Sequence, residues 1–415
     1  MNPFEQKPMK MNDGIMDWAT IYPKPYCKRT VDPYTRLRVI LMNGIEVGST
    51  TFKHQFHRSC TNNDLRRELA LSRRIEQQQQ KCIDWLSPID ETQLEVTIGY
   101  EHLAVDLTAW LAQNEPNPYV KQALDFALLE DFDHLYRYAN LLELDTQIPA
   151  QDIVKGYVDI TPGRPTIAEH RYPFDDVKNP VDFATADIQT KLNTLIITMA
   201  EQQTMNFYMN VGSMYYNDIG RQLYQEIGMI EEQHVSHYGS LIDPKSTWLE
   251  KMLLHEYMEC YLYYSFYEDE ADPNIKSIWE MHLEQEIAHL HKAAQLLSQY
   301  ENKQWEQVIP GGKFPKLLHF HDTKDYVRQV LGEQVLLTAN KEGYVNIQDL
   351  PKDHDYFFYQ DRLNHNVSAV PSHGVIEKHQ KLFNTDYRGE SKQNPVEALR
   401  DRTVDNTSIG RIPQV

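Results

Sequence analysis

Apolar residues recur at helical spacing along most of residues 61–300 of this 415-residue chain. Positions that recur every three or four residues share one face of a helix, so the pattern predicts helices that bury one side. Breaks in the pattern, such as the one at Asp272-Pro273, indicate tight turns between successive helices. We therefore predict three helical hairpins, at about residues 91–143, 184–238 and 246–300.

The segments on either side of these hairpins show different patterns. In residues 36–56, Asn43-Gly44 lies between two apolar runs, which favours a type I′ turn and predicts a small β-hairpin. Residues 61–86 are predicted to be helical, with the run Gln77–Gln80 on a solvated face. The helical periodicity fades after residue 300, and one more helix is predicted at about residues 322–337.

The predicted organisation has three parts. Residues 1–60 form an irregular N-terminal segment with the β-hairpin, residues 61–300 form a helical bundle, and residues 301–415 form a C-terminal extension. The predicted fold class is accordingly mainly α.

Each predicted hairpin carries the same pattern of acidic and histidine residues. A carboxylate on the first helix is followed at a constant interval by a second carboxylate and, three positions on, by a histidine (131 − 101 = 231 − 201 = 286 − 256 = 30). Residues three apart lie on one helix face and can reach one metal ion, and two helices of about 20 residues return the chain to the level of the first carboxylate. The candidate metal ligands are Glu101, Asp131, His134, Glu201, Glu231, His234, Glu256, Glu286 and His289.

These nine residues lie on apolar helix faces, where an uncompensated carboxylate is costly to bury. Two hairpins would together supply four carboxylates and two imidazoles, the ligand set of a dinuclear iron or manganese site. Glu259 shares the face of Glu256 and is an alternative ligand. A protein that binds no metal and uses these side chains in buried polar networks is the structural alternative.

The sequence leaves open which hairpins combine. Ligand type favours the second with the third, because both have Glu at every acidic position. Chain reach favours the first with the second, because about 40 residues separate them, whereas the short link 239–247 would have to be taut to cross a bundle. In a third arrangement, the third hairpin pairs with its copy in another chain, which would make the protein a homo-oligomer.

Composition narrows the partners and the compartment. The chain has 41 basic and 60 acidic residues, a net charge of −19, which argues against nucleic acid and anionic membranes as partners. No run of 18 apolar residues predicts a membrane span, and the first residues lack the apolar run of a signal peptide. The four cysteines form no C-x-x-C pair, so we expect reduced thiols and a cytoplasmic location. They are Cys27, Cys60, Cys82 and Cys260.

The pattern of the nine candidate ligands resembles the ferritin-like di-iron carboxylate superfamily, which includes rubrerythrins, bacterioferritins and di-iron oxygenases. The chain departs from that pattern in its third hairpin, in Asp131 where Glu is usual, and in lacking rubredoxin cysteines. The resemblance implies an antiparallel helical bundle around dinuclear iron, with manganese as the alternative metal. It further implies an oxidoreductase that reacts with dioxygen or peroxide, with a small organic substrate as a further partner.

The same ligand set is also compatible with a ferritin-like iron-binding protein that has ferroxidase activity and no organic substrate. Four tyrosines lie near the candidate ligands in sequence and are candidates for redox-active groups, although packing in the core is the preferred role for each. They are Tyr100, Tyr208, Tyr238 and Tyr263.

Overall fold

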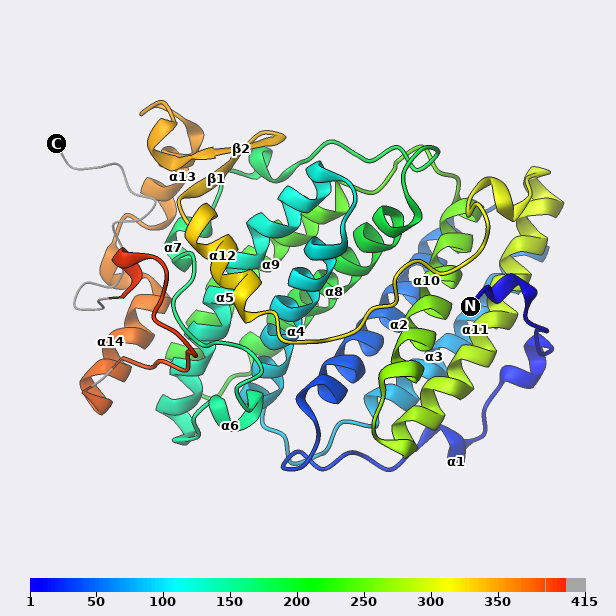
Figure 1. Cartoon of the computed structure of the whole chain (residues 1–415), viewed down its shortest axis with the longest axis horizontal. Helices are drawn as coiled ribbons and strands as arrows, with labels where there is room; N and C mark the ends of the chain where they lie inside the picture. Colours follow the sequence, from blue (N-terminus) through cyan, green and yellow to red (C-terminus); the bar gives the residue numbers. More distant parts are fainter. Residues whose placement is uncertain (385, 401–415) are drawn as a thin grey trace.

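The computed structural model describes residues 1–384 and 386–400 and confirms a mainly helical protein (Figure 1). Eight long helices form four successive hairpins, one more than the sequence pattern predicted. The helices are α2 (Pro33–Ser59), α3 (Asn63–Asp84), α4 (Gln93–Asn114), α5 (Pro118–Thr146), α8 (Ile188–Gly212), α9 (Asp218–Gly239), α10 (Trp248–Asp269) and α11 (Pro273–Glu301).

Shorter elements precede, connect and follow these hairpins. The first two hairpins follow α1 (Trp18–Ile21), and α6 (Gln151–Val154) and α7 (Thr166–Glu169) lie in the long connection between α5 and α8. The C-terminal part contains α12 (Lys324–Gln334), β1 (Leu337–Asn340), β2 (Gly343–Asn346), α13 (Asp355–Leu363) and α14 (Pro371–Phe383). The two strands pair antiparallel, with Leu337 opposite Asn346. The predicted helix at 322–337 corresponds to α12. The C-terminal part packs against α5 through α12 and α14.

Local sequence signals explain where the long helices begin. Each starts after a residue whose side chain accepts hydrogen bonds from the first free backbone N–H groups. Thr92 and Thr247 each form a capping box with a Glu three residues later. In α5 and α11, Pro118 and Pro273 occupy the first helical position, where the missing N–H costs nothing.

The four hairpins form two sets of four helices that lie side by side (Figure 1). Set A contains α4, α5, α8 and α9, and set B contains α2, α3, α10 and α11. The pairing is nested, because the two middle hairpins of the chain form set A and the two outer hairpins form set B. The sets meet along α2, α4, α8 and α10. Within the described residues, no helix has the length and apolar character needed to cross a membrane.

The helices also reveal a tandem repeat in the chain. The bounds of α9, α10 and α11 differ from those of α3, α4 and α5 by one constant offset in residue number (for example, 218 − 63 = 239 − 84 = 155). The start of α8 has the same offset from the start of α2 (188 − 33 = 155). The first two hairpins are therefore one copy of a four-helix stretch and the last two are a second copy. Each helix set combines one hairpin from each copy.

The predicted β-hairpin at residues 36–56 is wrong, because this segment lies within α2. Asn43-Gly44 forms no turn; instead, Asn43 donates a hydrogen bond to Gln203 of α8 at 2.9 Å. A Cβ atom on Gly44 would lie 2.8 Å from the Gln203 side chain, and one on Gly48 would lie 2.3 Å from Met199. The glycines therefore allow two helices to approach closely, a role that a local turn signal cannot distinguish from a turn.

Candidate metal centre

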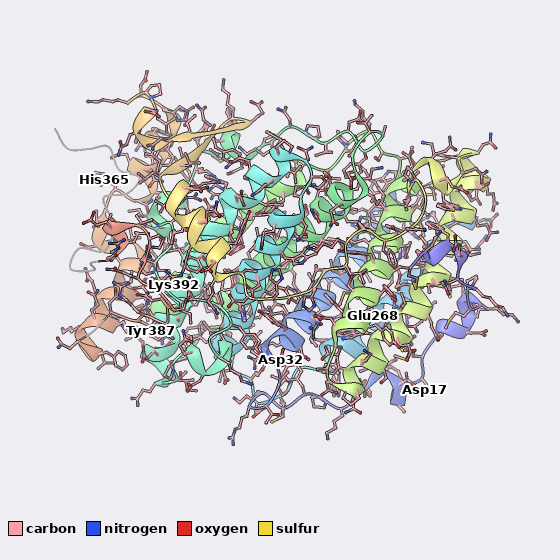
Figure 2. All side chains as sticks on the ribbon, in the orientation of Figure 1. Asp17, Asp32, Glu268, His365, Tyr387 and Lys392 are labelled. Carbon is pink, nitrogen blue, oxygen red and sulfur yellow. The ribbon has the colours of Figure 1, made fainter. Side chains whose placement is uncertain are left out.

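Asp17, Glu268 and His365 are examples of ionisable side chains that are exposed at the surface (Figure 2). Six of the predicted ligands behave differently and meet in the interior of set A, each with at most 1% of its surface exposed. We call these six residues cluster A. They are Glu101 from α4, Asp131 and His134 from α5, Glu201 from α8, and Glu231 and His234 from α9.

Cluster A contains two overlapping groups of potential ligand atoms, each group lying within 4.8 Å. Each group includes one imidazole, His134 in the first and His234 in the second, and both groups include Asp131 and Glu231. Asp131 and Glu231, which belong to both groups, could each contribute ligand atoms to two cations. The structure thus brings together the first two predicted hairpins, as chain reach favoured.

Both histidines of cluster A are held by carboxylates on their outer side. His134 Nε2 lies 2.9 Å from Glu169 Oε2, and His234 Nε2 lies 2.8 Å from Glu130 Oε2. With a metal bound and each Nε2 donating its proton to these carboxylates, each Nδ1 would direct its lone pair into the cluster. Without a metal, burial lowers the pKa of both histidines, but the surrounding carboxylates outweigh burial and raise it well above the usual range, so the imidazoles are protonated. Carboxylates that orient histidines in this way are typical of metal sites, where they also raise the basicity of the ligand.

The inner atoms of cluster A lack hydrogen-bond partners among the described residues. Both carboxylate oxygens of Asp131, Glu201 and Glu231 are buried without a hydrogen bond, as is Nδ1 of each histidine. The ring nitrogens instead face the carboxylates, with His134 Nδ1 3.0 Å from Glu231 Oε1. Buried polar atoms are normally hydrogen-bonded, so this concentration of unpartnered donor atoms fits a bound cation. Four carboxylates and two imidazoles are suitable ligands for iron or manganese.

Burial and mutual charge shift the acid–base equilibria of cluster A. Burial raises the pKa of Glu101 and Glu201 well above the usual range of a glutamate, and neighbouring carboxylates add to this effect. Burial also opposes ionisation of Glu231, but the imidazoles of His134 and His234 outweigh it and lower its pKa to about 2. Without a cation, the cluster must keep protons to offset its charge, and a cation that binds there would displace them.

The other three predicted ligands, Glu256, Glu286 and His289, lie in set B rather than in cluster A. They meet residues from α2 and α3 that the sequence analysis did not select. We call this second group cluster B. Its members, all with at most 1% of their surface exposed, are Glu46, Lys53, Glu76, Gln79, Glu256, Glu259, Glu286 and His289.

The partner hairpin of cluster B has the same spacing of acidic residues as the three predicted hairpins. Glu46 precedes Glu76 by the interval seen in the other hairpins (76 − 46 = 30), and Gln79 occupies the third position after Glu76, where the other hairpins have histidine. The interpretation of Gln77–Gln80 as a solvated face is wrong for Gln79, which is buried and donates a hydrogen bond to Glu286 at 2.7 Å. The predicted β-hairpin at residues 36–56 hides this spacing, because it places Glu46 outside a helix.

Two further residues that support cluster A were also not predicted. Glu130 is adjacent to a candidate ligand on α5, and its carboxylate also accepts hydrogen bonds from Arg164 and Arg171. Glu169 comes from the short helix α7 in the long connection. Glu130 could have been noticed as a second acid next to Asp131, whereas nothing in the local sequence of Glu169 indicates that the connection folds back onto His134.

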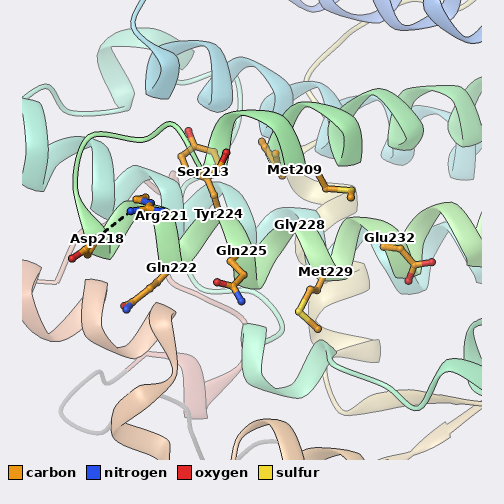
Figure 3. Close-up of a pocket in the computed structure, with 12 residues that line it drawn as sticks. Met209, Ser213, Asp218, Arg221, Gln222, Tyr224, Gln225, Gly228, Met229 and Glu232 are labelled. Atoms are coloured by element: carbon orange, nitrogen blue, oxygen red, sulfur yellow. Dashed lines mark ion pairs between the residues drawn. The ribbon is translucent and has the colours of Figure 1, made fainter.

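A surface pocket of about 740 Å³ lies over helices α8 and α9 (Figure 3). Apolar and polar side chains line it together, among them Tyr208, Met209, Asp218, Arg221, Tyr224, Met229 and Glu232. Tyr208 is buried, and its hydroxyl donates a hydrogen bond to Glu101 of cluster A. One side chain thus both lines the pocket and contacts a predicted ligand.

Comparison of the chain with protein-family models, with curated proteins and with solved structures found no match.

Proposed function

We propose that this protein is an oxidoreductase with a ferritin-like fold, whose cluster A holds a dinuclear metal centre that reacts with dioxygen or peroxide. The observation that carries the proposal is the pair of overlapping ligand groups that share Asp131 and Glu231. Iron is the expected metal and manganese the alternative. A pair of such ions, when bound, would supply the electrons and the open coordination positions that reduction of dioxygen or peroxide requires.

The side chains around cluster A have separate roles in this proposal. Glu101, Asp131, Glu201 and Glu231 neutralise the metal charge, while Glu130 and Glu169 fix the two imidazoles. Burial raises the pKa of Tyr208 well above that of a free phenol, so its hydroxyl keeps its proton and orients Glu101. Complete burial of the six ligands limits access of water to the site.

The pocket over α8 and α9 supports a small organic substrate as the second reactant. Its volume of about 740 Å³ lies within the range of small-molecule sites, roughly 300–1,000 Å³. Its methionines and tyrosines can contact the apolar part of a substrate, while Asp218, Arg221 and Glu232 can bind polar groups. Tyr208 connects this lining to Glu101. A site for iron storage alone does not require such a pocket.

Anaerobic loading of the full chain with Fe(II) or Mn(II) tests the proposal. Elemental analysis should find metal that Asp131→Asn removes, and the loaded protein should consume dioxygen or hydrogen peroxide in an electrode assay. Glu268→Gln, which changes an exposed glutamate, is the control and should retain both properties. Metal binding without consumption of either oxidant, or no metal in cluster A by anomalous scattering, would refute the proposal. Continued oxidation of excess Fe(II) with accumulation of ferric iron would instead indicate a ferroxidase.

A further inference from the structure

Cluster B is the counterpart of cluster A in the tandem repeat, and the substitutions between them are specific. Adding or subtracting 155 maps Glu101, Asp131 and His134 onto Glu256, Glu286 and His289, and maps Glu201, Glu231 and His234 onto Glu46, Glu76 and Gln79. The acidic positions are therefore all retained, while one histidine is replaced by an amide. Gln79 has a weaker ligand group than an imidazole, which removes one nitrogen ligand from cluster B.

A lysine takes a place in cluster B that a tyrosine takes in cluster A. Lys53 corresponds to Tyr208 (208 − 53 = 155), and both side chains reach the corresponding glutamate of the other hairpin. Tyr208 donates to Glu101, whereas Lys53 Nζ lies 2.7 Å from Glu256 Oε1 and also pairs with Glu76. The ammonium group thus lies where Glu76, Glu256 and His289 bring their ligand atoms together.

A fifth carboxylate offsets the added positive charge. Glu259 corresponds to Ala104 (259 − 104 = 155), so cluster B has one more acidic side chain than cluster A. If the imidazoles are neutral, the four carboxylates of cluster A carry four negative charges. The five carboxylates and one ammonium of cluster B have the same net charge. Lys53 therefore does not remove the requirement for a cation in cluster B.

The added carboxylate also forms a new group of ligand atoms. Oxygens of Glu256, Glu259 and Glu286 lie within 4.8 Å of one another, and these three residues are fully buried. Neither oxygen of Glu259 has a hydrogen-bond partner among the described residues, and no ion pair to it is found there. The counterpart group in cluster A cannot exist, because Ala104 has no ligand atom.

We infer that cluster B is a second metal site of a different kind, which holds a single divalent cation between Glu256, Glu259 and Glu286, with the Lys53 ammonium in place of a second cation. The all-oxygen ligand set favours a hard cation such as Mn²⁺ or Mg²⁺ over softer metals. The inference depends on the residues of cluster B and not on the proposed reactivity of cluster A.

Metal counting on the full chain with Mn(II) as the probe tests this inference. After anaerobic loading and desalting, wild-type protein should retain one ion in cluster B, located by anomalous scattering at the manganese edge. Glu259→Gln, which replaces a buried carboxylate by a neutral group of similar shape, should lose that one ion and keep those of cluster A. Glu284→Gln changes an exposed glutamate of the same hairpin and should lose none.

The possible outcomes separate the two clusters. An unchanged ion count in Glu259→Gln, two ions in cluster B, or no anomalous density there in the wild type would each overturn the inference. The wild-type map needs no variant, so a folding defect in Glu259→Gln does not remove the test. Ions in cluster B but not in cluster A would refute the proposed oxidoreductase and leave the single-cation site standing.

Discussion

Replacement of Lys53 by methionine should strongly destabilise the metal-free protein. Burial alone would lower the pKa of Lys53, but Glu256 and its neighbouring carboxylates outweigh burial and raise it, so the amine stays charged. Lys53, Glu76 and Glu256 all have fully buried side chains, and the ammonium pairs with both carboxylates. Loss of one partner from a buried ion pair typically costs about 3–5 kcal/mol, because the remaining charge is left uncompensated.

Urea unfolding in the presence of a chelator measures this loss. Lys53→Met should lower the free energy of unfolding by about 3–5 kcal/mol, whereas Lys245→Met, at an exposed lysine between α9 and α10, should change it by less than about 0.5 kcal/mol. Mn(II) at about 100 times its dissociation constant should raise the free energy of unfolding of the variant by about 2.7 kcal/mol per bound ion relative to the same variant in chelator. A variant as stable as wild type in chelator would mean that protons, not Lys53, neutralise cluster B.

Three further substitutions test other parts of the structure. Glu169→Gln should weaken metal binding at cluster A roughly 10- to 100-fold in a competition titration, because it loosens the hold on His134. Gly163→Ala should lower the free energy of unfolding by about 1–3 kcal/mol in urea, because its Cβ would lie 2.8 Å from the Leu129 carbonyl oxygen. Burial raises the pKa of Glu226 from 4.5 to about 7, so its contribution to stability falls as pH rises through that interval. Glu226→Gln should therefore gain up to about 3 kcal/mol over wild type at about pH 8, with little difference at about pH 4, both measured by urea unfolding.

Control substitutions distinguish these specific effects from a general loss of stability. Glu143→Gln removes a carboxylate that accepts from His379, a histidine outside both clusters, and should leave metal affinity unchanged. Gly374→Ala, inside α14 with nothing within 4 Å of the added Cβ, should stabilise by about 1 kcal/mol. Equal metal affinity in Glu169→Gln and Glu143→Gln, equal stability in Gly163→Ala and wild type, or an unchanged pH profile in Glu226→Gln would contradict the corresponding reasoning.

The sequence predicted most of the helices, because helical periodicity is a local property. It also identified all six residues of cluster A as candidate ligands, because the constant spacing of acidic positions can be read along the chain. It did not decide the pairing of hairpins, because pairing depends on how the long connection 147–187 crosses the protein. Chain reach nevertheless favoured the arrangement that the structure has. The prediction for segment 36–56 is wrong because Gly44 allows close contact with α8 and does not form a turn. The sequence around Gly44 does not show that its partner is a distant helix.

The nested pairing of the hairpins explains how one chain can hold two different clusters. Each cluster takes one hairpin from each copy of the repeat, so every position of the repeat occurs once in cluster A and once in cluster B. A change in one copy, such as lysine where the other has Tyr208, alters one cluster and leaves the other intact. Because Lys53 and Glu259 come from different copies and add opposite charges to the same cluster, neither is well tolerated alone in a buried site. Their joint presence in cluster B, against Tyr208 and Ala104 in cluster A, is therefore best explained as a paired change that kept the charge of the site while altering what it binds.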